Sequence, residues 1–194
     1  MEYNIIISGT GGQGTVLASR LIAAAAIKKG LFARTSETIG MAQRGGCVTS
    51  HVRLAAGGKI PSSPILGAKT ADMLIAMEIA EAVRVLPLLK AGGTVIACAH
   101  AVFPITGSYD KAEVTAYLQN AAPGARIIDC AEFIKKNGVK TLNVFLLAAA
   151  AQSGELPFTA DELEEAVREN VPPKFLEINL TAFNAGKEAY HGKF

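Results

Sequence analysis

Short apolar runs alternate along the chain with longer segments whose apolar positions recur at helical spacing. The first run, residues 3–8 (YNIIIS), is typical of a buried parallel strand. Residues 15–29 (TVLASRLIAAAAIKK) repeat leucine and alanine at helical spacing and stop before Gly30. The chain therefore begins, by prediction, with a strand, a glycine-rich turn and a helix.

Further runs predict the remaining strands. They lie at residues 31–35, 47–54, 72–77, 94–97 and 126–128. Within residues 47–54 polar and apolar positions alternate, which predicts a strand with one polar face. Residues 36–46 are polar and rich in glycine and predict a loop, and the pair Gly57-Gly58 predicts a hairpin-like turn.

Helical patterns separate these strands. They lie at residues 80–89, with a bend near Pro87, and at 110–120, 142–151, 159–170 and 174–185. Thr159 and Glu162 have the spacing of a capping box, in which each side chain binds an otherwise free backbone N–H. Strands that alternate with helices predict an α/β fold: a doubly wound, mostly parallel, Rossmann-like sheet with helices on both faces. We expect one domain over residues 1–194, and the helices after about Val139 are candidates for an appendage to its core.

Composition narrows the classes of function. Half of the residues are apolar and 19% are charged, with a net charge of +2 from 19 basic and 17 acidic residues. The apolar excess favours either a large core or a face that a partner chain covers. Without a basic run, nucleic acid is a poor candidate partner, and no apolar run is long enough to cross a membrane. The dispersed cysteines, in a chain without a leader pattern, favour a reducing cytoplasm and predict no metal or cluster site; they are Cys47, Cys98 and Cys130.

The turn between the first strand and the first helix, GTGGQG at residues 9–14, satisfies the pattern GxGxxG. The first glycine allows a tight turn, the second lets a phosphate reach the backbone, and the third lets helix and strand pack closely. Free N–H groups and the positive end of the helix then favour an anion. The candidate phosphate-binding residues are Gly9, Gly11, Gly12, Gln13, Gly14 and Thr15. A tight turn without a ligand is the alternative.

The dinucleotide signature around this turn is incomplete. An acidic residue about twenty positions further on should bind the ribose hydroxyl groups. That position falls near Arg34, and Glu37 lies beyond the predicted strand. Arg34 would suit a 2′-phosphate, which keeps NADP open, but neither residue makes a strong case for a nicotinamide enzyme.

The loop at residues 40–46 (GMAQRGG) is the second unusual segment. Its arginine lies beside two glycines, and this combination suits a carboxylate, a phosphate or a cluster of carbonyl groups. We expect this loop and the glycine turn to lie together at the carboxyl edge of the sheet, where open α/β sheets bind ligands. The candidate ligand or partner contacts are Gln43, Arg44, Gly45 and Gly46, with His51 and Arg53 on one face of the next strand. A polar loop that only packs against a partner subunit is the alternative.

The sequence shows no set of residues whose types and spacing predict catalysis. His51 has no nucleophile or carboxylate near it in the sequence, so a structural histidine is the favoured interpretation. His100 and His191 show no metal-ligand spacing. We therefore assign no catalytic residue and no metal ligand to this chain.

Three ordered segments carry a family resemblance: NIIISGTGGQGTVLAS, GMAQRGGCVTSHVRL and ADMLIAMEIAEAVRVLPLLKAGGTVI. Together they resemble the gamma subunit, or gamma domain, of 2-oxoacid:ferredoxin oxidoreductases, over most of the chain. The AQRGG…SHVR form and the tail from Pro172 to Gly186 resemble the indolepyruvate type, whose small subunit is called beta.

The resemblance implies a non-catalytic subunit of a larger cytoplasmic enzyme. In that family a 2-oxoacid is decarboxylated on thiamine diphosphate, electrons pass through iron–sulfur clusters to ferredoxin, and the acyl group passes to coenzyme A. The resemblance places thiamine diphosphate and the clusters in a large partner subunit, and implies aryl pyruvates as substrates. The apolar content favours a homodimer or a hetero-oligomer with that subunit. The glycine turn would then bind coenzyme A or another phosphate.

Two other hypotheses stay open. One is a stand-alone Rossmann-type nucleotide-binding dehydrogenase, which would need a ribose-binding acid and a proton-transfer group. The other is a pure assembly module whose glycine turn binds no ligand.

Overall fold

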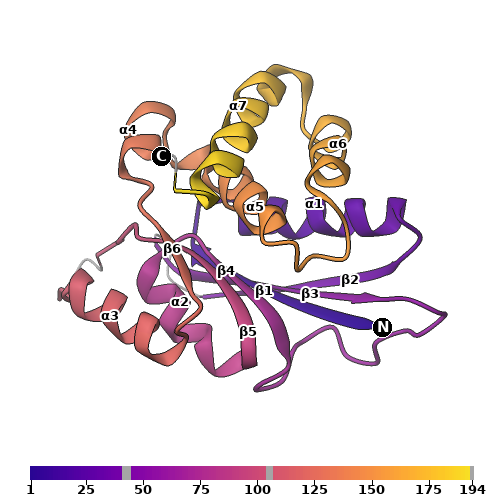
Figure 1. The fold of residues 1–194 in the computed structure, drawn as a ribbon, viewed down its shortest axis with the longest axis horizontal. Coiled ribbons are helices and arrows are strands. Elements are labelled where there is room, and N and C mark those ends of the chain that lie inside the picture. The colour runs from indigo at the N-terminus through magenta and orange to yellow at the C-terminus, as the bar shows by residue number, and fades with distance from the viewer. Residues whose placement is uncertain (41–44, 104–106, 193–194) are drawn as a thin grey trace.

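A six-stranded sheet lies at the centre of the computed structural model, which describes residues 1–40, 45–103 and 107–192 (Figure 1). The strands follow the order β2-β3-β1-β4-β5-β6 across the sheet. Their bounds are β1 (Glu2–Thr10), β2 (Phe32–Ile39), β3 (Cys47–Ala55), β4 (Ala71–Ala76), β5 (Leu89–Cys98) and β6 (Arg126–Ile128). All of the strands predicted from apolar runs are present, with boundaries that differ by a few residues.

Five of the six strands run in the same direction. β1, β4, β5 and β6 form successive parallel pairs, whereas β3 is antiparallel to both β1 and β2. The connection from β2 to β3, residues 40–46, is too short for the crossover helix that a parallel neighbour needs, so β3 returns antiparallel beside β2. The predicted α/β fold with a mostly parallel sheet is confirmed, with one reversed strand.

Helices cover both faces of this sheet (Figure 1). One face carries α1 (Thr15–Lys28), α5 (Leu142–Gln152), α6 (Ala160–Asn170) and α7 (Pro173–Tyr190), and the buried side of α4 (Ala131–Asn137) joins the same core. The other face carries α2 (Ile79–Val85) and α3 (Lys111–Ala121). Short 3-10 turns follow α2 at Leu86–Leu88 and precede α5 at Val139–Thr141.

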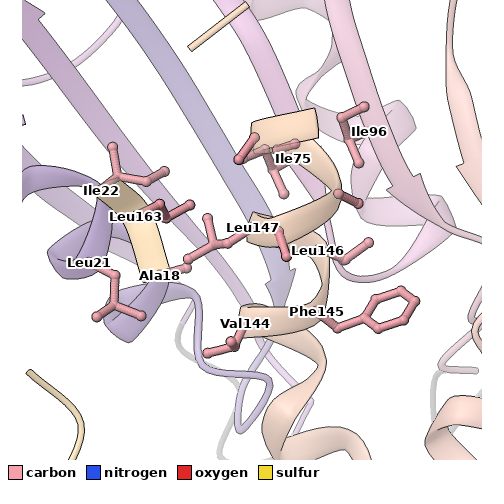
Figure 2. Packing of buried hydrophobic residues seen from close by; sticks show 14 of the residues in the cluster. Ala18, Leu21, Ile22, Ile75, Ile96, Val144, Phe145, Leu146, Leu147 and Leu163 are labelled. Carbon is pink, nitrogen blue, oxygen red and sulfur yellow. The ribbon is translucent and has the colours of Figure 1, made fainter. Parts of the chain in front are cut away.

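The larger core lies between the sheet and the C-terminal helices. Every residue of α5 from Leu142 to Ala151 is buried. Figure 2 shows Leu147 of α5 beside Ile22 of α1 and Leu163 of α6, with Ile75 of the sheet close by. The expectation of an appendage after Val139 is therefore wrong: α5 is apolar all round because it is a central element of the core.

Two local predictions are also wrong, and one helix was missed. Residues 36–39 extend β2 instead of beginning a loop, because β3 supplies hydrogen-bond partners up to Ile39 for a strand that shows no apolar run. Helix α4 was not expected. Gly57 and Gly58 do form a turn with positive φ, but the strands on either side, β3 and β4, are not paired.

The N-terminus of α6 agrees with the sequence in detail. Thr159 Oγ1 accepts a hydrogen bond from the Glu162 amide at 3.2 Å, and Glu162 Oε2 accepts one from the Thr159 amide at 2.7 Å. Both halves of the predicted capping box are thus present. No helix in the described ranges is long and apolar enough to span a bilayer.

Candidate functional site

The glycine turn joins the carboxyl end of β1 to the first turn of α1 and is held together by Gln13. Gln13 Oε1 accepts a hydrogen bond of 2.7 Å from the Thr10 amide, and Gln13 Nε2 donates one of 3.4 Å to the Met77 carbonyl. A Cβ at Gly9 would lie 2.6 Å from the same Oε1 atom. Because the Gln13 side chain is buried and both of its polar atoms are engaged, it shapes the turn instead of facing a ligand.

The open side of the turn is formed by Gly12. Gly12 is exposed, has a φ of 93°, and a Cβ built there would meet no atom within 4 Å. The amides of Gly11 and Gln13 are already bonded, to the carbonyl groups of Gly46 and Thr10. The amides of Gly12, Gly14 and Thr15 make no hydrogen bond to any described residue. These three amides are the donors that an anion could use.

The N-terminus of α1 lacks the groups that usually neutralise such a helix end. Its N-cap, Gly14, adopts the left-handed conformation and provides no side chain. No acidic residue lies in the first turn. The positive end of the helix dipole is therefore uncompensated by the helix itself, which favours an anion from outside.

Asn143 in the first turn of α5 contacts the turn from the C-terminal part of the chain. Its Nδ2 atom donates a hydrogen bond of 3.1 Å to the Gly14 carbonyl, and a Cβ at Gly14 would lie 2.5 Å from that nitrogen. Its Oδ1 atom is buried and has no hydrogen-bond partner among the described residues. Sequence reasoning missed Asn143, because nothing local connects it to a turn near the other end of the chain.

The loop before β3 lies beside the glycine turn. The Gly11 amide donates a hydrogen bond of 2.9 Å to the Gly46 carbonyl, and Gly45 is exposed with a φ of 67°. The structure thus brings Gly45 and Gly46 to the carboxyl ends of β1 and β2. Gln43 and Arg44 lie outside the described residues.

His51 and Arg53 lie on one face of β3, as predicted, but away from the glycine turn. In the antiparallel register Cys47 is opposite Thr10, whereas Arg53 is opposite Asn4. Six residues of strand correspond to about 20 Å. The two halves of the predicted contact surface therefore do not form one site.

Both side chains instead hold the segment that follows β3. His51 Nδ1 accepts a hydrogen bond of 3.2 Å from the Leu66 amide, and burial lowers the pKa of His51 while the Glu37 carboxylate partly opposes this. Arg53 donates to the Ser63 carbonyl at 2.8 Å and to Asn4 Oδ1 at 3.2 Å. The segment after β3, and Arg84 of α2 through Thr49, therefore contact the polar face of β3.

The two residues considered for ribose recognition are engaged elsewhere. Arg34 donates a hydrogen bond of 2.8 Å to the Pro61 carbonyl, and its guanidinium lies 5.6 Å from the centre of the Phe32 ring. Glu37 Oε1 accepts a hydrogen bond of 3.2 Å from Ser19 Oγ. Neither side chain supports the nicotinamide hypothesis.

Glu78, a buried carboxylate just after β4, lies at the same edge of the sheet as the glycine turn. Sequence reasoning missed this residue. Its Oε2 atom caps α2 by accepting the Glu81 amide at 2.7 Å, and its Oε1 atom accepts the Val102 amide at 3.2 Å and the Tyr109 hydroxyl. Burial, with the hydrogen bond to Glu78, raises the pKa of Tyr109 above its ordinary value. A single Glu directly after the apolar run of residues 72–77 was the available signal.

The guanidinium group of Arg84 lies near the same edge of the sheet. Arg84 of α2 donates a hydrogen bond of 2.7 Å to Thr49 Oγ1 and forms an ion pair of 2.6 Å with Glu81. Thr49 is opposite Ser8 in the β1–β3 register, and Ser8 directly precedes the glycine turn of residues 9–14. Arg84 is therefore committed to holding α2 against β3.

The described residues form no metal centre. No group of three or more His, Cys, Asp or Glu side chains could hold an ion within the described ranges. Cys47, Cys98 and Cys130 are free thiols, and two of them are buried.

Comparisons with known proteins agree in both sequence and fold. The family model described as Pyruvate ferredoxin/flavodoxin oxidoreductase matches residues 4–189. The chain is 35% identical over 196 residues to the Indolepyruvate oxidoreductase subunit IorB of Pyrococcus horikoshii, covering 97% of this chain and 96% of that protein.

Two solved structures show the same fold. One is the gamma subunit of a keto/oxoacid ferredoxin oxidoreductase from Geobacter sulfurreducens, with a TM-score of 0.69, 25% identity, and coverage of 98% of this chain and 99% of that chain. The other is 2-oxoglutarate:ferredoxin oxidoreductase from Magnetococcus marinus, solved with 2-oxoglutarate, coenzyme A and succinyl-CoA bound. It has a TM-score of 0.72 at 20% identity, and the match covers 98% of this chain and 31% of that longer chain.

Proposed function

Because this chain belongs to the pyruvate ferredoxin/flavodoxin oxidoreductase family, as the small subunit of a multi-subunit oxidoreductase acting on 2-oxoacids with ferredoxin as acceptor, we propose that its substrates are aryl pyruvates of the indolepyruvate type. The observation that carries this proposal is the similarity to the IorB subunit over nearly the full length of both proteins. Residues 1–194 act as one gamma-type domain. The free thiols at all three cysteines suit a cytoplasmic location.

The partner in this proposal is a large subunit that holds thiamine diphosphate and iron–sulfur clusters. Those groups supply the decarboxylation of the 2-oxoacid and the transfer of electrons to ferredoxin, with coenzyme A as acyl acceptor. This chain contributes binding and orientation. In this proposal the small subunit has no turnover of its own.

The glycine turn is proposed to hold a phosphate group of coenzyme A. Gly12 leaves open space in front of the backbone, and the free amides of Gly12, Gly14 and Thr15 lie at a helix end without a carboxylate. These are the features that favour a phosphate at a helix N-terminus. Arg44, two residues before Gly46 in the adjoining loop, would add a compensating positive charge.

The activity is tested by reconstitution. The chain alone and the chain with its cognate large subunit are each incubated with thiamine diphosphate, coenzyme A and ferredoxin, and reduction of ferredoxin is followed with indolepyruvate, phenylpyruvate, pyruvate and 2-oxoglutarate. We expect activity only in the complex, and a larger kcat/KM for the aryl substrates. A complex that prefers pyruvate or 2-oxoglutarate contradicts the aryl pyruvate assignment.

The anion site is tested by calorimetry of coenzyme A binding to the assembled complex at fixed salt. Gly12→Asp places a side chain and a negative charge where the phosphate approaches, so we expect binding to be lost. Arg44→Lys keeps the charge but loses the bidentate guanidinium and should weaken binding by roughly 1–3 kcal/mol. If an assembled Gly12→Asp complex binds coenzyme A as tightly as the wild type, the turn is structural and the chain is an assembly module.

A further inference from the structure

A second concave surface lies next to the first turn of α1, between the start of α7 and the 3-10 turn before α5. It has a volume of about 530 Å³. Its apolar wall includes Leu17 of α1, Val139 of the 3-10 turn, and Phe175 and Ile178 of α7. We refer to this surface as the α7 groove.

Two of its wall residues are large apolar side chains left open to water. Phe175 is 49% exposed and Ile178 is 43% exposed, one helical turn apart on α7. The buried residues of α7 are Asn179, Ala182, Phe183, Gly186 and Ala189; they begin one turn further along the helix, and Asn179 also lines the groove. Large apolar side chains that stay partly exposed and line a concave surface are characteristic of a protein–protein interface.

The charge around the groove is positive. Lys140 lies in its wall, and Lys174 Nζ lies 4.9 Å from the centre of the Phe175 ring. Neither lysine forms an ion pair with a described residue, and no Asp or Glu occurs among the described residues of the wall. Glu177 lies between Phe175 and Ile178 in the sequence and is an exposed carboxylate, but helical spacing puts it on another side of α7.

We propose that the α7 groove docks an acidic segment of the large subunit that inserts an apolar side chain, with an aromatic ring as the best fit. The apolar wall and the Phe175 ring accept the side chain, and Lys140 and Lys174 pair with the carboxylates of the segment. This inference rests on the proposed function, which supplies the large subunit as the partner. The groove adjoins the first turn of α1, so the same interface covers the surface next to the glycine turn.

The test measures the dissociation constant between the small subunit and its cognate large subunit. Phe175→Ala with Ile178→Ala removes the exposed anchors and leaves the buried residues of α7 unchanged. Since truncating an interface anchor typically costs more than 1 kcal/mol and 1.4 kcal/mol is tenfold, we expect binding to weaken by about tenfold or more. Tyr117→Ala is the matched control, because Tyr117 is 58% exposed on α3, on the opposite face of the sheet.

The attraction between the lysines of the groove and an acidic segment is tested with a separate variant. Lys140→Glu should weaken association and reduce its dependence on salt, since it replaces an attractive charge with a repulsive one. Lys59→Glu, an exposed lysine beside the Gly57-Gly58 turn, should leave both unchanged. Circular dichroism of each variant confirms that the fold is intact.

The outcomes separate this inference from the proposed function. If the wild-type chain does not bind the large subunit, both are overturned. If the wild type binds and the Phe175/Ile178 double variant binds equally well, the docking surface is wrong and the proposed function stands. If the double variant assembles normally but loses affinity for coenzyme A, the groove is a small-molecule site, and the docking proposal is again overturned.

Discussion

The side-chain amide of Asn143 donates a hydrogen bond of 3.1 Å to the carbonyl oxygen of Gly14, although the two residues are 129 positions apart in the sequence. Gly14 is the N-cap of α1 and adopts the left-handed conformation. Asn143 belongs to the first turn of α5, the central helix of the larger core. The geometry of the glycine turn therefore depends on how the C-terminal helices pack, as well as on its own glycines.

The first prediction concerns Gly14→Ala. The substitution forces a Cβ into a backbone with a φ of 81° and to within 2.5 Å of Asn143 Nδ2. We expect a loss of roughly 1–3 kcal/mol in the free energy of unfolding, measured by urea denaturation.

Gly12→Ala is the control for the conformational part of that loss. Gly12 has a comparable φ of 93°, but a Cβ there meets nothing within 4 Å. Gly12→Ala should therefore cost less than Gly14→Ala. If the two variants are equally stable, the contact with Asn143 does not constrain the turn.

The second prediction concerns the crossing of α5 and α7 at Gly186. A Cβ at Gly186 would overlap the backbone carbonyl of Phe145 and lie 3.0 Å from the Ala148 Cβ. Because a backbone atom in a buried helix cannot move aside alone, Gly186→Ala should destabilise the protein by roughly 1–3 kcal/mol. Gly124→Ala, where a Cβ meets no atom within 4 Å, should change stability little; thermal unfolding of the two variants gives the comparison.

The third prediction concerns pH. Burial holds the pKa of His51 below its ordinary value of 6.5, so in the acid range the unfolded chain binds this proton more readily than the folded chain. The stability contributed by neutral His51 is fully present above pH 6.5 and is lost as the pH falls through the lowered folded pKa. Through His51 alone, the free energy of unfolding changes by at most about 1.4 kcal/mol per pH unit.

The measurement compares the free energy of unfolding of the wild type and His51→Asn from pH 8 down to the acid range. Asn keeps a short polar side chain that can accept the Leu66 amide but does not titrate. We expect the variant to be less stable at neutral pH and to lose less stability on acidification. If the free energies of unfolding of the two proteins fall equally with pH, His51 does not change its protonation on unfolding.

The fourth prediction concerns Glu78. Its carboxylate accepts hydrogen bonds from the Glu81 amide, the Val102 amide and the Tyr109 hydroxyl. Glu78→Gln replaces one acceptor atom with a donor that faces another donor, so we expect a loss of roughly 1–3 kcal/mol. Tyr109→Phe removes only one of these bonds and should cost less.

A double-mutant cycle checks this network. The double variant Glu78→Gln, Tyr109→Phe should lose less stability than the sum of the two single variants, because both act on one hydrogen bond. Additive losses would mean that the Glu78–Tyr109 contact contributes nothing to stability.

Local sequence patterns determined the parts of this protein whose causes are local. The turn at residues 9–14 was predictable because positive φ and close backbone approach require glycine wherever they occur. The capping box at Thr159 and Glu162 was predictable because both hydrogen bonds span three residues. The alternation of strands and helices likewise identified the α/β class, since periodicity reports which side of an element is buried.

Tertiary structure alone decided where these pieces meet. The antiparallel placement of β3 puts Arg53 opposite Asn4, at the far end of β1 from the glycine turn, although only a few residues separate it in sequence from Gly46. The burial of α5 as the centre of the core brings Asn143 to Gly14, and with it Thr141 to the α7 groove. These relationships depend on long-range packing and strand pairing, which are set by the free energy of the whole core and leave no signal in any single stretch of sequence.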